Sequence, residues 1–227
     1  MKATARVAAI VLAAGRSTRM GADNKLLAEV GGRTMVRRVA EAALGSGARP
    51  VLLVTGNRAT EVRAALAGLE ITLVDNPDFA AGLSSSLKAG IGAVPADCDG
   101  ALLLLGDMPL VTGAHLDRLV AAFVAGDGAA IIVPTHEGRR GNPVLWPRAY
   151  FEEMLQLEGD AGAKRLIAAH AACVREIDLG ADAIFADVDT PEALARLRAT
   201  SCSAARSGWT YPTARRPSSA RRRSRCR

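Results

Sequence analysis

The chain has 227 residues, of which 49% are hydrophobic and only 4% are aromatic. This length fits one medium-sized domain, and its core has to be built from Ala, Val, Leu and Ile, a mixture typical of α/β layers. Eight of the 29 Lys and Arg residues fall in residues 200–227, which contain no Asp or Glu, so residues 1–199 carry 21 basic and 23 acidic side chains. The net charge of +6 therefore reflects a basic tail, and a nucleic-acid-binding function would rest on that tail alone.

The cysteine spacing and the hydropathy of the sequence argue against a cysteine-bound metal site and against a membrane-spanning segment. The four cysteines stand at positions 98, 173, 202 and 226, without the close spacing of a metal-binding motif, which favours ordinary thiols. The amino terminus leads into only about eight apolar residues, too few to span a bilayer. We therefore expect a cytoplasmic protein that does not associate with a membrane.

The first informative segment follows an apolar run, Val7 to Val11, which has no polar alternation and so predicts a parallel strand buried on both faces. The chain then enters a basic loop with the sequence LAAGRSTRMG at residues 12–21, and Lys25 comes four residues later. Glycines at 15 and 21 allow backbone N–H groups to approach a ligand closely, and the cations suit a nucleoside triphosphate. A Walker A loop is excluded, because five residues rather than four separate the two glycines. The dinucleotide fingerprint G-x-G-x-x-G is absent from this loop as well.

Strands and helices are expected to alternate after this loop. Strands are predicted at 50–55, 71–74, 100–105, 129–134, 144–146, 173–177 and 184–188. Helices are predicted at 34–44, 60–67, 115–125 and 148–157. Of three further helices, one begins at the serines near 84, one ends at 170 and one begins at 191. The β-α-β-α-β order is typical of a parallel sheet with right-handed crossovers. We therefore expect a Rossmann-like α/β fold of three α/β/α layers, with a mostly parallel sheet of about seven strands.

Candidate functional residues stand where these strands end. The most apolar strand, 100–105, runs into Gly106-Asp107-Met108-Pro109, and a carboxylate at the carboxyl end of a central strand sits where open α/β sheets bind ligands. Asp107 is thus either a ligand-binding residue or a turn residue before proline. Ser84 and Ser85, at a helix start, serve either as caps or as hydroxyls that face a nucleotide. The polar, glycine-rich loop 135–143 carries two cations and is either solvated or substrate-binding.

The loop LAAGRSTRMG with its following lysine resembles the signature of the nucleotidyltransferases that make molybdopterin dinucleotide cofactors. It is most similar to the molybdenum cofactor cytidylyltransferase branch. The segments GLSSSLKAG at 82–90, GDMP at 106–109 and GRRGNPV at 138–144 extend the resemblance, which covers residues 6 to about 198. We expect a nucleotidyltransferase domain at 1–199. The tail at 200–227 has no hydrophobic periodicity, so we expect it to be disordered.

The resemblance implies transfer of a cytidylyl group from CTP to molybdopterin that bears molybdenum, with release of pyrophosphate. It implies catalytic roles for Lys25, Asp107 and Arg19, and it implies Mg²⁺ held by Asp107 and Asp189. The segment 138–144 would lie near the acceptor substrate. The residues implied in nucleotide binding are Leu12, Ala13, Ala14, Gly15, Arg16, Ser17, Arg19, Met20, Gly21, Lys25, Ser84 and Ser85. The implied partners are CTP, molybdopterin and a molybdenum hydroxylase as client, with no nucleic acid and no membrane.

Three other functions stay open from the sequence. A related nucleotidyltransferase would use GTP or another phosphate acceptor, because the phosphate loop and the aspartates are shared across the larger fold family. A non-catalytic protein would handle the molybdenum cofactor as a chaperone and release no pyrophosphate. A nucleic-acid-binding module would depend on residues 200–227 and bind in a salt-sensitive way.

Overall fold

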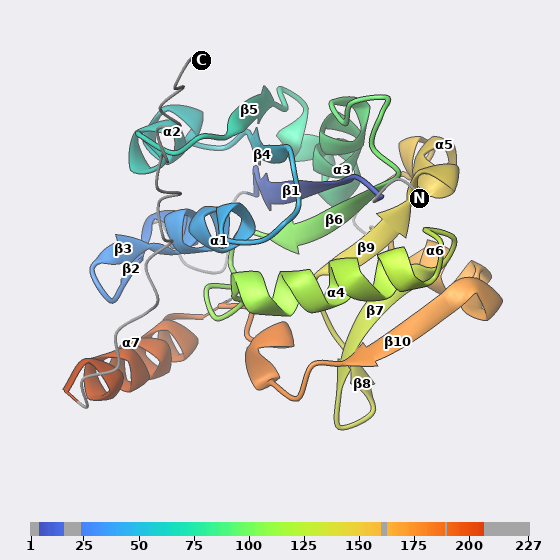
Figure 1. The fold of residues 1–227 in the computed structure, drawn as a ribbon. Coiled ribbons are helices and arrows are strands. Elements are labelled where there is room, and N and C mark those ends of the chain that lie inside the picture. The colour runs from blue at the N-terminus through green and yellow to red at the C-terminus, as the bar shows by residue number, and fades with distance from the viewer. Residues whose placement is uncertain (1–4, 16–23, 160–162, 189, 207–227) are drawn as a thin grey trace, which may run out of the picture.

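The computed structural model describes residues 5–15, 24–159, 163–188 and 190–206, and these residues form three layers (Figure 1). One sheet of eight strands lies in the middle, with the order β10-β7-β9-β6-β1-β4-β5 along its main path and β8 paired to β7 beside it. β9 runs antiparallel to β6 and β7, whereas the other pairs on this path are parallel. The expected α/β fold with a mostly parallel central sheet is therefore confirmed.

The bounds of the elements follow the expected alternation. The strands of the main sheet are β1 Val7–Ala13, β4 Val51–Thr55, β5 Thr72–Asp75, β6 Gly100–Leu105, β7 Ile131–His136, β8 Arg139–Arg140, β9 Val144–Pro147 and β10 Val174–Asp178. A separate hairpin pairs β2 Glu29–Val30 with β3 Arg33–Thr34. The helices are α1 Met35–Leu44, α2 Ala59–Ala65, α3 Leu83–Gly92, α4 Gly113–Ala125, α5 Phe151–Leu155, α6 Lys164–Ala169 and α7 Pro191–Arg206. Short 3-10 turns are η2 Lys25–Leu27, η3 Phe79–Ala81, η4 Arg148–Tyr150, η5 Ala171–Cys173 and η6 Asp182–Ile184.

Strand β1 shows why the central strands are apolar along their whole length. All of its residues are buried, and alternate side chains enter two different hydrophobic cores. Val7, Ala9 and Val11 pack with residues of α1, α2 and α4, whereas Ala8 and Ile10 pack with residues of α3, α5 and α6. Helices thus cover both faces of the sheet, with α1 and α4 in front of it in Figure 1 and α3 behind. A strand that is buried on both faces has no solvent-exposed side, so its sequence does not alternate between apolar and polar residues.

The strand register brings three chain segments to one edge of the sheet. Leu12 of β1 pairs with Leu105 of β6, and Ala13 pairs with Thr55 of β4. Because these strands are parallel, the residues that follow them emerge side by side at the carboxyl edge. The loop after β1, the turn after β4 and Asp107 after β6 are therefore neighbours.

One predicted strand is absent from the described residues. The apolar run at 184–188 suggested a strand, but Asp182–Ile184 forms the turn η6 and residues 186–188 have no regular structure. Ile184 and Val188 are buried as the pattern indicated. Their backbone groups bond to loops instead of a neighbouring strand: the Ile184 carbonyl accepts from Asn142 N–H at 3.1 Å, and Val188 N–H donates to the Asp107 carbonyl at 3.1 Å.

Two details of helix ends also differ from expectation. Thr34 is the N-cap residue of α1, but its hydroxyl makes no capping hydrogen bond among the described residues. Helix α7 continues to Arg206, past the boundary expected at Ala199, and residues 207–227 lie outside the described part. Within the described residues, none of the helices has the length and apolar character needed to cross a membrane.

Candidate active site at the carboxyl edge of the sheet

An ion pair between Lys25 and Asp107 occupies the carboxyl edge of β6. The Lys25 Nζ atom lies 2.5 Å from Asp107 Oδ2, and each side chain is only 15% exposed. A partly buried pair of this kind is screened less by solvent than a surface pair, so each charge is held in place by the other. Two of the three residues expected to be catalytic, Lys25 and Asp107, are therefore in direct contact, and the third, Arg19, lies outside the described residues.

Backbone contacts on both sides hold Asp107. The preceding Gly106 donates its N–H to the Leu12 carbonyl at 3.0 Å, and a Cβ at Gly106 would lie 3.0 Å from that same oxygen. Glycine thus allows β6 to end against the start of the phosphate loop. On the other side, the Asp107 carbonyl accepts from Val188 N–H at 3.1 Å. Asp107 is fixed between the exit of β1 and the chain segment just before residue 189.

Lys25 is placed by a short capped turn. The Asn24 side-chain oxygen accepts a hydrogen bond from Leu26 N–H at 3.0 Å, which caps η2. Leu26 is buried, and one of its methyl carbons would lie 3.3 Å from a Cβ at Gly106. The cap and the buried leucine anchor this turn against the residue before Asp107, and so they aim the lysine at the carboxylate.

The second carboxylate oxygen of Asp107 fits a bound cation. Oδ1 is buried and has no hydrogen-bond partner among the described residues. A buried oxygen with negative charge and no donor is costly, and carboxylate oxygens are the ligands that Mg²⁺ and Mn²⁺ prefer. No group of three or more His, Cys, Asp or Glu in the described part of the chain forms a complete metal site. Asp107 can therefore supply one ligand to such a metal, and the predicted second ligand, Asp189, lies outside the described residues.

The serines at the start of α3 belong to a network organised by Asn76, which is buried at the end of β5. The Asn76 amide nitrogen donates to Ser85 Oγ at 3.0 Å and to Ser86 Oγ at 3.1 Å, and Ser85 Oγ donates to the Gly82 carbonyl at 2.8 Å. The N-cap residue of α3 is Gly82, so neither Ser84 nor Ser85 occupies the capping position. Ser84 is buried and its N–H donates to the Gly159 carbonyl, while Ser85 is partly exposed.

Asn76 is a residue that sequence reasoning missed. Its position offered a signal, because it is a polar residue directly after a strand at the same edge as Asp107.

The phosphate loop is described only in part. Leu12, Ala13 and Ala14 are buried, and Gly15 is exposed. Gly15 does not use the positive φ that glycine permits, and a Cβ there would meet no atom within 4 Å. The described part of the chain therefore gives no steric reason for glycine at this position. The predicted residues Arg16, Ser17, Arg19, Met20 and Gly21 lie outside the described residues.

Both cations of the loop between β7 and β9 are engaged by protein groups. Arg140 Nε lies 2.7 Å from Glu176 Oε1, and the Arg139 guanidinium lies 4.5 Å from the centroid of the Phe185 ring. His136 stands between two carboxylates, with Nδ1 3.8 Å from Asp178 and Nε2 3.7 Å from Asp182. The loop thus contacts the segment 182–185, while its residues 137–140 are exposed to solvent, so both alternatives for this loop stay open.

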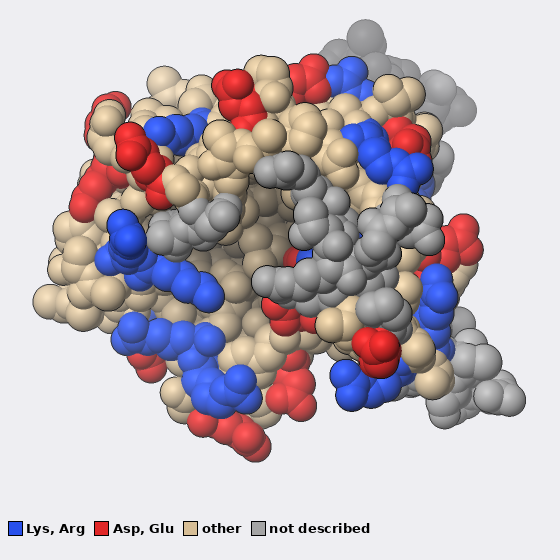
Figure 2. Space-filling model, turned by 180° about the vertical axis from the view of Figure 1, so that it is seen from behind, with Lys and Arg blue, Asp and Glu red and all other residues tan. Residues whose placement is uncertain are grey.

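The surface has a hollow with positive charge gathered on one side of it (Figure 2). Seen from behind, the molecule is hollowed near its centre, and Lys and Arg side chains gather on the left of the hollow (Figure 2). A hollow bordered by positive charge raises the local concentration of anions such as nucleotides.

Comparisons with known proteins agree with this geometry. Residues 9–174 match the MobA-like NTP transferase domain. The chain is 32% identical to the molybdenum cofactor cytidylyltransferase of Escherichia coli strain K12 over 187 residues, which are 81% of this chain and 91% of that protein. It is 31% identical to the nicotine blue oxidoreductase of Paenarthrobacter nicotinovorans over 84% of this chain and 96% of that protein.

One further group of relatives matches this chain over only part of its own length, and other relatives have solved structures. The bifunctional protein GlmU of Kineococcus radiotolerans is 38% identical over 58% of this chain, but the match spans only 29% of GlmU. Rv0371C of Mycobacterium tuberculosis H37Rv, solved as a complex with manganese, has a TM-score of 0.73 and 31% identity, covering 86% of this chain and 99% of that one. A homologue of that protein from Mycobacterium sp. strain JC1 has a TM-score of 0.77 and 32% identity over 87% of this chain and 98% of that chain. Because the family model matches residues 9–174, most of the chain, the chain belongs to the family of MobA-like NTP transferase domains.

Proposed function

We propose that this protein is a molybdenum cofactor cytidylyltransferase, which transfers a cytidylyl group from CTP to the terminal phosphate of molybdopterin that bears molybdenum. Family membership supports nucleotidyl transfer in general, and the similarity to the Escherichia coli cytidylyltransferase over most of both chains favours this branch. The observation that carries the proposal is the partly buried Lys25–Asp107 pair beside the phosphate loop. A molybdenum hydroxylase would receive the product, and the enzyme would act in the cytoplasm.

The reaction needs no protein nucleophile. An oxygen of the acceptor phosphate attacks the α-phosphorus of CTP, a new P–O bond forms, and the bond between the α-phosphorus and the β-phosphate oxygen breaks. Pyrophosphate carries away the electron pair of the broken bond. The protein contributes by holding the two phosphates in line and by opposing the charge that develops on them.

Asp107 is the described residue that would hold a divalent cation. Its buried Oδ1 is suited to a hard cation, and Asp189 is the second ligand that the family resemblance implies. Asp107 and Asp189 would hold the cation, which would supply positive charge to offset the negative charge that develops on the departing pyrophosphate. The manganese complex of Rv0371C supports a divalent metal in this family without specifying magnesium.

Lys25 would act on the α-phosphate. Without substrate, its ammonium serves as the counter-ion of Asp107 at 2.5 Å. Its flexible four-carbon stem would allow the ammonium to reach an oxygen of the α-phosphate. Arg19 and the amides of the phosphate loop would hold the β- and γ-phosphates, and Ser85 at the start of α3 would face the nucleoside.

Base choice and acceptor are the parts of the proposal that rest on similarity alone. A direct test measures pyrophosphate release with each of the four NTPs and Mg²⁺, with and without molybdenum-loaded molybdopterin. We expect release only when CTP and the loaded acceptor are both present. Equal release with GTP or with another phosphate acceptor would favour a different nucleotidyltransferase of this family. Binding of the pterin with no release from any NTP would favour the non-catalytic chaperone.

A further inference from the structure

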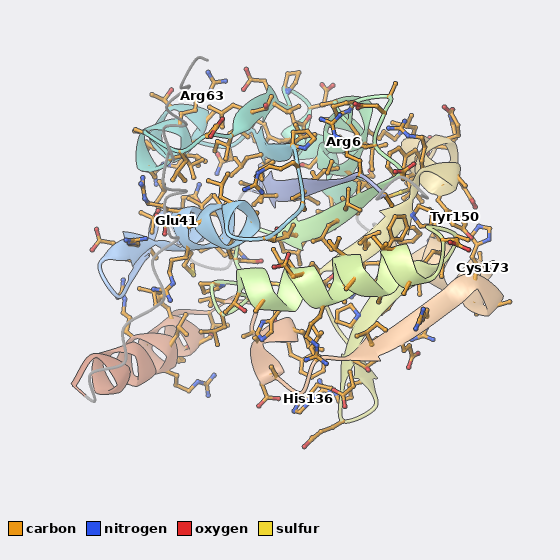
Figure 3. All side chains as sticks on the ribbon, in the orientation of Figure 1. Arg6, Glu41, Arg63, His136, Tyr150 and Cys173 are labelled. Carbon is orange, nitrogen blue, oxygen red and sulfur yellow. The ribbon has the colours of Figure 1, made fainter. Side chains whose placement is uncertain are left out.

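The loop between β7 and β9 and the segment that precedes residue 189 form one connected unit. We call residues 136–142 the clasp and residues 182–188 the strap. His136 lies at the end of β7, close to η6 of the strap, as Figure 3 shows. The clasp holds the strap by a backbone bond, a close packing contact, a ring contact and the approach of the His136 ring to the Asp182 carboxylate. Each of these can be altered separately.

The tightest contact is between Gly141 and Ile184. A Cβ at Gly141 would lie 2.6 Å from the Ile184 carbonyl oxygen and under 3.0 Å from two of its side-chain carbons. The next residue, Asn142, donates its N–H to that same carbonyl at 3.1 Å. Only glycine at 141 lets the two backbones approach this closely, because any side chain would force the strap away.

Two side-chain contacts lie on either side of this point. The Arg139 guanidinium stacks on the Phe185 ring at 4.5 Å, and His136 Nε2 lies 3.7 Å from Asp182 Oδ1. Cation–π contacts of this kind fix both partners with modest strength. The clasp therefore contacts three of the first four residues of the strap.

The other end of the strap is joined to the candidate metal ligand. Asp187 N–H donates to the Phe185 carbonyl at 2.9 Å, and Val188 N–H donates to the Asp107 carbonyl at 3.1 Å. Val188 is buried and packs with Val30 and Met35. Asp189, the second ligand implied by resemblance, is the next residue in the chain.

We propose that the clasp is a positioning device for the metal site: by fixing the strap against Asp107, it sets the affinity of that site for a divalent cation. The inference rests on the proposed function only in that Asp107 binds such a cation. It gives Arg139 and Gly141 a role that needs no contact with either substrate. The alternative, that this loop binds the acceptor, makes a different prediction for the same variants.

The test is Mn²⁺ binding to the full chain, followed by the electron paramagnetic resonance signal of free Mn²⁺, in the absence of acceptor. Gly141→Ala should raise the Mn²⁺ dissociation constant by about 10-fold, the lower end of the usual effect of residues outside the ligand shell. Arg139→Ala, which removes only the ring contact, should raise it by about 3-fold. Two matched controls should leave it unchanged. Arg140→Ala removes the neighbouring arginine, which pairs with Glu176 on β10, and Gly92→Ala adds a Cβ where no atom lies within 4 Å.

The possible results separate the clasp from the metal site itself. If wild-type protein binds no Mn²⁺, or if Asp107→Asn binds it equally well, the metal role of Asp107 fails and the clasp fails with it. If wild type binds, Asp107→Asn does not, and both Gly141→Ala and Arg139→Ala bind as wild type does, the clasp alone is contradicted. Arg139→Ala with unchanged Mn²⁺ affinity but a raised KM for the acceptor would assign the loop to substrate binding. If Gly141→Ala fails to fold by circular dichroism, Arg139→Ala decides.

Discussion

The ammonium of Lys25 lies 2.5 Å from the carboxylate of Asp107, although 82 positions separate the two residues in the chain. The contact joins the turn after the phosphate loop to the end of β6. Removal of either partner leaves the other charge partly buried without its counter-ion, so substitutions at the two positions will not have additive effects. The first two predictions start from this pair.

Lys25→Ala should lower kcat by ~100-fold and change the CTP dissociation constant by less than ~10-fold. The reason is that a fixed ammonium beside the α-phosphate stabilises the transition state more than the bound nucleotide, because other groups hold the β- and γ-phosphates. Lys25→Arg should restore only part of the rate, because a planar guanidinium reaches differently. Both constants should be measured on one preparation. Collapse of CTP affinity with kcat preserved at saturation would make Lys25 a binding residue.

Asp107→Asn should remove most metal-dependent turnover while the protein still folds, because the amide keeps the shape of the carboxylate and loses its charge. Unfolding by urea should show a loss of ~1–3 kcal/mol, since the ammonium of Lys25 then lacks its partner. Asp189→Asn should be milder, because relatives carry either residue at this place by resemblance. Full activity in Asp107→Asn would remove the mechanism, and equal, complete losses in both variants would contradict the role given to Asp189.

Two glycines of α3 should respond to alanine in opposite directions. Gly90 is buried, and a Cβ there would lie 2.6 Å from a methyl carbon of Ile10, so Gly90→Ala should cost ~1–3 kcal/mol of unfolding free energy. Gly92→Ala meets no atom within 4 Å and should be neutral or stabilising by up to ~1 kcal/mol, because alanine favours the helix. Urea unfolding of both variants provides the measurement. Stabilisation by Gly90→Ala would mean that α3 does not pack against β1 as described.

His115 should make the protein less stable below neutral pH. Burial, and to a smaller extent the charge of Arg118, lower the pKa of His115 below its ordinary value. The imidazole Nδ1 accepts from Thr112 N–H at 3.3 Å in the capping box of α4, which requires the unprotonated nitrogen. Because the unfolded chain binds the proton more tightly, this stability is complete above the unfolded pKa of ~6.5 and is lost as the pH falls from there to the folded pKa.

His115→Gln supplies the control for this effect. Glutamine keeps an acceptor at the same helix position and does not titrate. The urea midpoint of the wild type should fall more between pH 7.5 and pH 5.5 than that of His115→Gln. Identical shifts in the two proteins would show that His115 contributes nothing to the pH dependence.

Much of the fold was predictable because the apolar strands and the turn residues act locally. The run at 100–105 and the glycine and aspartate after it predicted both β6 and the position of Asp107 at the ligand-binding edge. The strap could not be predicted in this way. Ile184 and Val188 are buried like strand residues, but the partners of their backbone groups, Asn142 and Asp107, are distant in sequence. Periodicity reports burial and does not report which backbone groups pair.

In the candidate site too, the residues marked by local sequence motifs were predictable, and those that depend on contacts between distant segments were not. Lys25 and Asp107 were found because loop and strand-end motifs mark them, and the structure adds that they touch. Asn76 escaped notice because a single asparagine before a proline also suits a plain turn. Its role depends on Ser85 and Ser86, which approach only when β5 and α3 pack together. The roles of the phosphate-loop cations and of Asp189 remain predictions.

The central claim is nucleotidyl transfer at the Asp107 site. The most direct measurement uses CTP labelled with ³²P at the α-phosphate and determines which product carries the label. With Mg²⁺ and molybdenum-loaded molybdopterin, we predict that wild-type protein moves the label into a molybdopterin cytosine dinucleotide and releases one pyrophosphate for each label transferred. Asp107→Asn should lose most of both activities, and Gly92→Ala should show both at the wild-type rate. The account is contradicted if the label stays in CTP although the wild-type protein is folded and the loaded acceptor is present. It is also contradicted if Asp107→Asn transfers as much label as the wild type.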